Sequence, residues 1–504
     1  MITILDTTLR DGEQTSGVSF SSHEKLSIAQ ALIGELGVDR LEIASARVSD
    51  GELESVKRMV SWAERAGFLE RLEVLGFVDK GESVRWIAQT GCKVMNLLCK
   101  GSYKHVTEQL RRTPEAHFSE IKETIQMATD AGLTVNIYLE DWSNGMQCSP
   151  DYVYLMMDTL KGEAINRFML PDTLGVLSPT LTFQYCQDMV NRYPNARFDF
   201  HAHNDYDLAV ANVYAALQAN ITCIHTTING LGERAGNAPL SSVLAVIKDQ
   251  LSIETNLCEQ KINHVSRLVE TFSGIHISTN QPVIGEHVFT QCAGIHADGD
   301  NKNDLYYNAL LPERFGRVRE YALGKNSGRA NIRKNLEELG MDMDDASMRK
   351  ITDRIIELGE KKEVLTQADL PYIVSDILHQ DALGDQAVRI LNYSLSLAQG
   401  LKPMAIVKLE IDGTAYEASA SGDGQYDAFM RALRSIYADL GRPFPVLTNY
   451  SVSIPPGGRT DAFVQTIISW RYDGEDFKTK GLDGDQAEAA IKATIKMLNK
   501  IERN

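Results

Sequence analysis

Short apolar runs rich in β-forming residues recur through the first half of the chain, and amphipathic stretches long enough for helices separate them. Strands that alternate with helices in this way pair in parallel. Eight such units predict a (β/α)8 TIM barrel, which we expect to span residues 1–275. A doubly wound open sheet is the alternative, although no G-x-G-x-x-G motif follows the first run. The eight runs cover residues 2–8, 40–45, 72–78, 93–99, 134–140, 167–173, 198–203 and 223–229.

The pattern changes beyond the predicted barrel. Residues 276–320 are rich in Gly, Asn and Asp, which indicates an irregular linker subdomain, and residues 321–388 contain stretches typical of short helices. Within residues 389–504, the order strand, Asp-Gly turn, strand and amphipathic helix occurs twice. This internal duplication predicts a C-terminal α+β domain built from two similar halves.

The charge and composition argue against several functional classes. A net charge of −17 disfavours nonspecific binding to nucleic acids or to anionic membranes. The chain has no apolar run close to the roughly 20 residues of a membrane span, and no signal-peptide pattern. Its seven cysteines are scattered without a C-x-x-C pair, which is typical of reduced thiols. We therefore expect a cytoplasmic protein with a small-molecule substrate and no nucleic-acid or membrane partner.

Polar residues gather where the predicted strands end. In a barrel, the C-terminal strand ends meet at one mouth, which is where TIM-barrel active sites lie. We therefore expect these side chains to converge. They are Arg10 and Asp11, Glu42, Glu140 and Asp141, Asp172 and Thr173, His201 and His203, and Asn229.

Two histidines at the end of the seventh run indicate a metal site. Side chains alternate along a strand, so His201 and His203 face the same way. Such a pair alone is a weak signal, because most pairs of this kind are ordinary strand-end residues. Asp11 from the first strand completes a three-ligand set for zinc, manganese, cobalt or magnesium. Asn237 is a further ligand or a partner of the ligands.

The same residues indicate a reaction. A divalent metal with open positions can chelate a 2-keto acid and make its keto carbon electrophilic. Arg10 can hold the developing alkoxide, form an ion pair with Glu42, or do both. Glu140 can handle a proton or serve only as a buried acceptor. Thr173 can bind a substrate carboxylate, whereas Asp172 can simply cap the next turn.

Four motifs, DTTLRDGEQ, LPDTLG, FHAHND and NGLGERAGN, resemble the signatures of the metal-dependent Claisen-condensing barrel enzymes. This family contains the 2-isopropylmalate, homocitrate and citramalate synthases. The similarity continues through VFTQCAGIHADG and LGKNSGR into the C-terminal duplication, so it covers essentially the whole chain. The resemblance implies an acetyl-CoA-dependent C-acyltransferase, which condenses acetyl-CoA with a 2-keto acid and releases CoA by hydrolysis.

The resemblance also implies roles for individual residues. His296 and Tyr306 match a histidine and a tyrosine that the family's linker region brings to the active site, often from the other protomer. This implies a homodimer. The remaining matches are Asp11, His201 and His203 as metal ligands, Arg10 beside the keto acid and Glu140 as the catalytic glutamate.

The fifth strand separates the branches of the family. Isopropylmalate synthases usually carry F-S-x-E-D there, whereas this chain reads IYLED, so that Tyr138 replaces a small serine. We expect Leu75, Leu98 and Tyr138 to form a small apolar pocket that suits a methyl group and crowds an isopropyl group. These departures resemble the branch that uses pyruvate and forms (R)-citramalate. A 2-isopropylmalate synthase acting on 2-oxoisovalerate is the alternative.

The resemblance extends to regulation. In relatives, the C-terminal duplication binds the end-product amino acid, which implies inhibition by isoleucine, or by leucine in the alternative. Glycine-rich segments at 421–424 and 481–485 open helices, where backbone N–H groups can receive a carboxylate; equally, they can be plain turns. Two rivals are a lyase of the 3-hydroxy-3-methylglutaryl-CoA type, which lacks such a tail, and a non-catalytic amino-acid sensor, against which the intact polar set argues.

Overall fold

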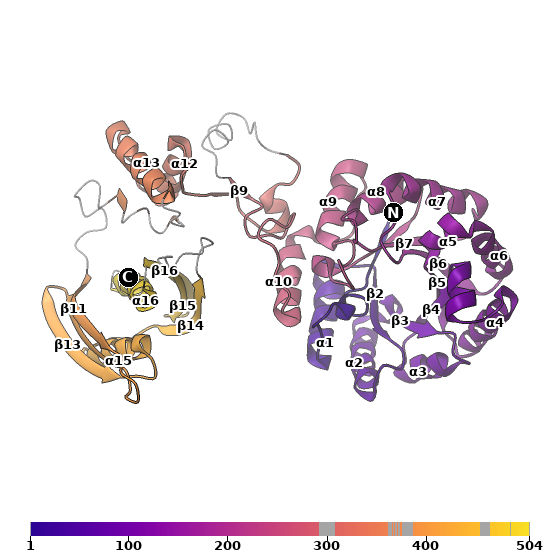
Figure 1. The fold of residues 1–504 in the computed structure, drawn as a ribbon, viewed down its shortest axis with the longest axis horizontal. Coiled ribbons are helices and arrows are strands. Elements are labelled where there is room, and N and C mark those ends of the chain that lie inside the picture. The colour runs from indigo at the N-terminus through magenta and orange to yellow at the C-terminus, as the bar shows by residue number, and fades with distance from the viewer. Residues whose placement is uncertain are drawn as a thin grey trace. The chain divides into compact units, whose positions relative to one another are not determined.

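The computed structural model describes residues 2–291, 308–360, 387–453, 464–483 and 485–502, with a few single positions between 361 and 386. The chain divides into two compact units (Figure 1). Of the described residues, the first unit contains 2–290 and 308–320, and the second contains Gln291 and those from Tyr321 onwards. Within the described ranges, no helix is both long and apolar enough to cross a membrane.

The first unit contains a closed barrel of eight parallel strands in chain order, which confirms the predicted fold and excludes the open sheet. The barrel closes where the first strand pairs with the eighth, from Thr3 opposite Cys223 to Asp6 opposite Thr226. The strands are β1 (Thr3–Asp6), β2 (Arg40–Ser45), β3 (Leu72–Phe77), β4 (Val94–Lys100), β5 (Thr134–Glu140), β6 (Ile165–Asp172), β7 (Phe198–Ala202) and β8 (Cys223–Thr226).

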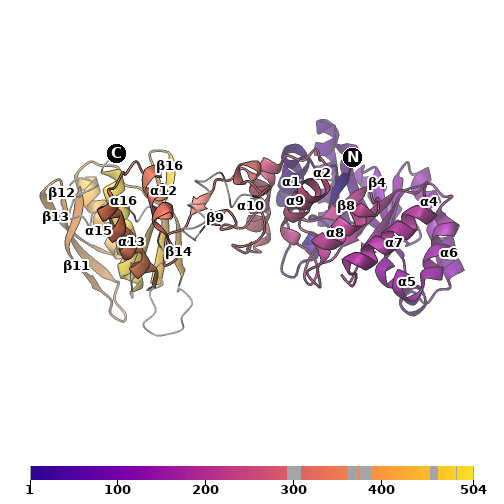
Figure 2. The same cartoon turned by 90° about the horizontal axis from the view of Figure 1, so that it is seen from above.

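Helices surround the strands (Figures 1 and 2). Four of them begin after a Ser or Thr whose side chain accepts a backbone N–H bond from three residues further on, which satisfies one of the free donors of the first turn. The helices are α1 (Ser22–Gln30), α2 (Asp50–Ala66), α3 (Glu82–Thr90), α4 (Pro114–Asp130), α5 (Trp142–Cys148), α6 (Pro150–Leu160), α7 (Pro179–Arg192), α8 (Ala209–Gln218), α9 (Leu240–Leu251) and α10 (Ile262–Ser273).

The barrel interior contains a buried polar network. Arg40 on β2 lies inside and binds Glu73 on β3 through two bonds of 2.5 and 3.0 Å. The same guanidinium reaches Asp199 on β7 at 2.5 Å. Glu73 and Asp199 are 2% and 0% exposed. One buried cation therefore bridges two buried carboxylates, and Arg167 provides a second cation for Asp199 at 3.2 Å, which together offset the cost of burying these charges.

Replacing Arg40 by methionine is expected to lower the free energy of unfolding by about 3–5 kcal/mol, because Glu73 then lies buried without a cation and Asp199 keeps only its longer contact with Arg167, at 3.2 Å. Urea unfolding measures this loss. Arg47→Met is the control: Arg47 pairs with Asp79 and Glu82, but it is 45% exposed, so its loss should cost less than about 1 kcal/mol. Equal losses for the two variants would contradict the prediction.

The second unit holds a small helical part and the duplicated part. Helices α12 (Arg329–Glu338) and α13 (Asp345–Glu360) share a small apolar core. The duplication consists of two three-stranded antiparallel sheets, each followed by a helix. In the first half these are β11 (Val388–Ser396), β12 (Met404–Ile411), β13 (Thr414–Ser421) and α15 (Gln425–Asp439); in the second they are β14 (Val446–Ser453), β15 (Val464–Tyr472), β16 (Glu475–Asp483) and α16 (Gln486–Ile501).

The hairpin turns of the two halves match. Asp412-Gly413 and Asp473-Gly474 join the second and third strands of each sheet, and all four residues have positive φ angles of 47–81°. This is the backbone that a two-residue hairpin requires, and Asp-Gly tolerates it well. Both helices contribute to one apolar core. The predicted α+β duplication is therefore confirmed.

Candidate active site at the C-terminal mouth of the barrel

Three predicted metal ligands meet at the mouth. Asp11 lies in the tight turn after β1, where its N–H bonds to the carbonyl of Thr7 at 2.8 Å, and the two histidines lie at the end of β7. Asp11 Oδ2 is 3.1 Å from His201 Nε2 and 3.7 Å from His203 Nε2. The two Nε2 atoms are 3.3 Å apart. All three side chains are buried, so their ligand atoms face one small common space.

The charge states of these groups suit a cation. Burial lowers the pKa of His201, and it lowers the pKa of His203 to about 4. Burial alone would raise the pKa of Asp11, but Arg10 and the two histidines bring it well below its usual range. A neutral imidazole pair and an ionised carboxylate are the forms that bind a divalent metal, so the residues present fit such an ion.

Asn237 supports Asp11. Its Nδ2 donates to Asp11 Oδ2 and to the carbonyl of Leu231, both at 3.0 Å. The loop that carries Asn237 depends on Gly236, whose φ is +83° and where an added Cβ would come within 1.9 Å of the Gly230 carbonyl oxygen. Only glycine fits that position without strain. The GLGERAGN segment thus shapes a tight loop that carries the amide to the carboxylate.

Arg10 forms the ion pair with Glu42 that was considered for it, and it also contacts Asp11. Its Nε donates to Glu42 at 2.6 Å, and its Nη1 lies 3.4 Å from Asp11 Oδ1. Glu42 is fully buried on β2 and also accepts a bond from Asn96 on β4 at 2.8 Å. The guanidinium is therefore clamped beside Asp11, with little freedom to turn away.

A cavity of about 210 Å³ opens next to the three ligands. Neighbouring strands place Leu98 directly opposite both Phe77 and Tyr138, so the apolar wall is built by strand register. The cavity contains every predicted pocket residue, together with five that the sequence did not single out. The lining residues are Arg10, Asp11, Gln14, Ser45, Leu75, Phe77, Leu98, Tyr138, Glu140, Pro171, Thr173, His201, His203 and Glu233.

Glu140 and Thr173 both reach this cavity. Glu140 forms a short ion pair with Lys100, which the sequence reasoning missed because a lysine at a strand end is usually solvated. The hydroxyl oxygen of Thr173 accepts a bond from the backbone N–H of Asp141 at 2.9 Å. Its proton thus remains free to donate into the cavity.

Two strand-end residues point elsewhere. Asn229 has a left-handed backbone, with φ +59°, and its amide bonds to Ser266 on α10 rather than facing the mouth. The carboxylate of Asp141 accepts bonds from Ser102 and Asn144 beside β5. The expectation that these two side chains join the mouth was therefore wrong.

Other predictions have clear outcomes. Asp172 caps the turn after β6, where it accepts bonds from Val176 N and Leu177 N, both at 3.0 Å. The six cysteines in the described ranges are free thiols, as expected. His296 and Tyr306 lie outside the described residues, so their predicted roles stay predictions.

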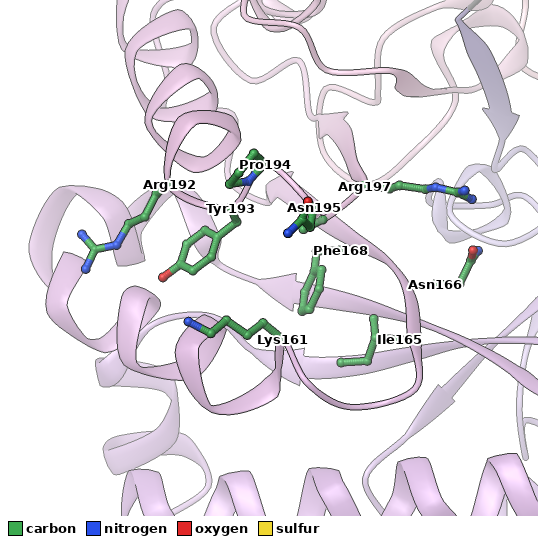
Figure 3. Close-up of a pocket in the computed structure, with 10 residues that line it drawn as sticks. Lys161, Ile165, Asn166, Phe168, Arg192, Tyr193, Pro194, Asn195 and Arg197 are labelled. Carbon is green, nitrogen blue, oxygen red and sulfur yellow. The ribbon is translucent and has the colours of Figure 1, made fainter.

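A larger cavity, of about 530 Å³, lies at the opposite end of the barrel strands (Figure 3). It is formed around the start of β6, at Ile165, and the segment that precedes β7, which includes Tyr193 and Arg197. TIM-barrel active sites lie at the C-terminal strand ends instead. The smaller cavity is therefore the candidate active site.

Comparison with known proteins agrees with this assignment. Residues 1–269 match the HMGL-like family, residues 283–363 the homocitrate synthase post-HMGL domain-like family, and residues 364–502 the LeuA allosteric (dimerisation) domain. A putative (R)-citramalate synthase from Methanopyrus kandleri is 34% identical, over 93% of this chain and 90% of its own.

Two further relatives extend over nearly the full length of both chains. A probable 2-isopropylmalate synthase, also from Methanopyrus kandleri, is 33% identical over 100% of this chain and 98% of its own. The (R)-citramalate synthase of Methanocaldococcus jannaschii is 32% identical over 99% of each chain. The chain therefore belongs to the HMGL-like family, within the acetyl-CoA-dependent condensing enzymes that include the (R)-citramalate and 2-isopropylmalate synthases.

Proposed function

We propose that the protein condenses acetyl-CoA with pyruvate and water to give (R)-citramalate and CoA. The observation that carries the choice of pyruvate is the 210 Å³ cavity, in which Leu75, Leu98 and Tyr138 crowd the space beside the candidate ligands. The relatives support the condensation, but they include enzymes named for either product at similar identity. The pocket is therefore what favours the smaller keto acid.

Asp11, His201 and His203 would hold the metal, with Asn237 fixing the carboxylate. When bound, a divalent ion supplies Lewis-acid polarisation of the keto carbonyl. Arg10 donates to the oxygen on which negative charge develops, and Glu42 keeps the guanidinium in place.

Glu140 acts on acetyl-CoA, and Thr173 binds the keto acid. Glu140 sits at the cavity edge, where it handles the proton that leaves the acetyl methyl group, with Lys100 orienting its carboxylate. The free Thr173 proton donates to the substrate carboxylate. His296 and Tyr306 complete the site from the linker, in trans within a homodimer.

Room for acetyl-CoA lies beside the small cavity. A second cavity of about 640 Å³ shares Arg10, Gln14 and Ser45 with it and extends between the starts of α1 and α2. Its wall is rich in serine hydroxyls and small residues, including Ser49 and Gly51. The acetyl group can then reach the keto acid from the side of Arg10 while the longer thioester arm occupies the larger space.

Measurement of CoA release with a thiol reagent tests this function. With pyruvate, 2-oxobutyrate and 2-oxoisovalerate compared, we expect kcat/KM to be at least about tenfold higher for pyruvate than for 2-oxoisovalerate, because each misfitting methyl group costs about 1–3 kcal/mol. A chelator should abolish CoA release, and added divalent metal should restore it. Preference for 2-oxoisovalerate would indicate isopropylmalate synthesis, and the absence of CoA release with every keto acid would favour the lyase or the sensor.

We further propose that isoleucine inhibits the enzyme through the C-terminal duplication. The match to the LeuA allosteric (dimerisation) domain supports both a dimer and an effector site there. Of the two glycine-rich segments, the second already uses the Asp485 carboxylate to cap Ala487 N and Glu488 N, whereas Gly424 precedes α15 without a side-chain cap. The first segment is thus the better candidate to receive the effector carboxylate.

Deletion of residues 390–504 is expected to remove inhibition by isoleucine while some CoA release remains. The measurement compares the isoleucine concentration for half inhibition in the full chain and in the truncated one, with leucine as the control amino acid. Inhibition that persists unchanged after truncation would contradict the proposed location of the site. Inhibition of the full chain by leucine alone would favour the isopropylmalate alternative.

A further inference from the structure

The hydroxyl of Tyr138 lies in a buried polar network beneath the pocket. Its oxygen is 3.1 Å from Nδ1 of His225 on β8, 3.4 Å from Nη2 of Arg10 and 3.5 Å from Oε2 of Glu42. On the far side of the imidazole, Nε2 of His225 is 3.3 Å from Oδ2 of Asp199. Tyr138 and His225 are 2% and 1% exposed, so protein groups alone decide how the phenol is held.

The direction of each hydrogen bond follows from which groups can donate and which can accept. Burial alone would raise the pKa of Asp199, but Arg40 and His225 bring it well below its usual range, so the carboxylate can only accept. His225 must donate to it from Nε2. An imidazole that carries its one proton on Nε2 accepts at Nδ1, and the phenol oxygen lies 3.1 Å from that atom. Tyr138 therefore donates its proton to His225 and turns its lone pairs towards Arg10.

The same cluster does not suit a second metal. Asp199, Cys223 and His225 offer ligand atoms that lie close together. However, the guanidinium of Arg40 already lies 2.5 Å from Asp199 Oδ2 and 3.1 Å from Cys223 Sγ. The guanidinium of Arg40 thus takes the place of a metal ion in this cluster, and His225 remains available to accept the hydrogen bond of Tyr138.

We propose that His225, oriented by Asp199, is a positioning residue that fixes the phenol of Tyr138 and thereby limits the length of the keto-acid side chain. The identity of the preferred keto acid rests on the proposed function. The phenol packs edge-on against His225 and His201, with ring centroids 5.6 and 6.2 Å away. Without its acceptor on His225, the hydroxyl keeps only the longer contact with Glu42 Oε2, at 3.5 Å, and the ring that walls the pocket is held less firmly.

A double-mutant cycle tests the proposal. Tyr138→Phe removes only the hydroxyl, and His225→Gln keeps an amide donor for Asp199 while removing the acceptor at Nδ1. Each should lower the ratio of kcat/KM for pyruvate to that for 2-oxobutyrate by about two- to tenfold, the worth of one neutral hydrogen bond. Because both changes break the same bond, the double variant should show no further loss. This ratio does not depend on the folded fraction of each preparation.

The controls separate this proposal from others. Tyr193→Phe removes a hydroxyl that bonds the Tyr154 carbonyl outside the barrel, and it should leave the ratio unchanged. If His225→Gln does not fold, His225→Leu, which has no acceptor at this position, takes its place in the cycle. Additive effects, or an unchanged ratio in either single variant, would overturn the proposal. A wild-type preference for 2-oxoisovalerate would overturn the proposed substrate instead, and the cycle would then be read with that keto acid.

Discussion

Replacement of Glu140 by glutamine is expected to reduce kcat by about 10²–10⁴-fold while keto-acid binding changes little. Glutamine has almost the same shape and can still contact Lys100, but it cannot accept a proton from the acetyl methyl group. Glu140 lines the cavity at the end of β5, on the opposite side from Arg10 and Asp11, so its removal should not disturb the candidate ligands. CoA release at saturating substrate measures kcat, and calorimetric titration of metal-supplemented protein measures keto-acid binding.

Glu163→Gln provides a matched control. Glu163 also pairs with a lysine, Lys122, at 2.9 Å, but this pair is partly exposed on the outside of the barrel and should leave kcat unaltered. Weakened binding with normal turnover at saturation would contradict the role given to Glu140. It would make the residue a binding group, and the proton would then have to leave through another acceptor.

The barrel was predictable because the local sequence of each strand indicates a strand. Apolar runs bounded by turns gave strand positions that agree with the structure to within about three residues at either end. The rule that parallel strands end at one mouth then brought Asp11, His201 and His203 together, although 190 residues separate the first from the second. In the C-terminal unit, the repeated Asp-Gly turns made the positions of the two hairpins predictable.

The remaining features depend on contacts across the barrel. The alternation of side chains along β2, β7 and β8 predicts that Arg40, Asp199 and His225 each point into the barrel. It does not predict that closure of the barrel brings them into one network. That pairing is set by the stagger between strands, which no single segment encodes. The prediction for Asn229 was wrong for a local reason. Its own left-handed backbone turns its side chain towards α10.

The network also explains why the polar interior is tolerated. The three carboxylates of this network each contact a cation: Glu73 and Asp199 share Arg40, and Glu42 binds Arg10 and also accepts a bond from Asn96. The groups nearest the cavity are thus held by others deeper in the barrel. A rigid mouth of this kind keeps catalytic side chains in place before the substrates arrive.

Arg10→Gln is expected to lower kcat by about 10²–10³-fold, since it removes a charged donor aimed at the developing alkoxide. The change also has a structural cost, because Glu42 is fully buried and loses its cation. Breaking a buried ion pair from one side costs about 3–5 kcal/mol, so the single variant should unfold at lower urea. Loss of activity alone therefore cannot distinguish a catalytic role from a structural one.

The double variant Arg10→Gln with Glu42→Gln separates the two roles. A neutral amide at position 42 no longer requires a cation and can still accept the bond from Asn96, so most of the lost unfolding free energy should return. The loss of kcat should remain, because the charge that faces the keto acid is still missing. Recovery of both properties together would mean that Arg10 serves only to neutralise Glu42, and the alkoxide would then depend on the metal alone.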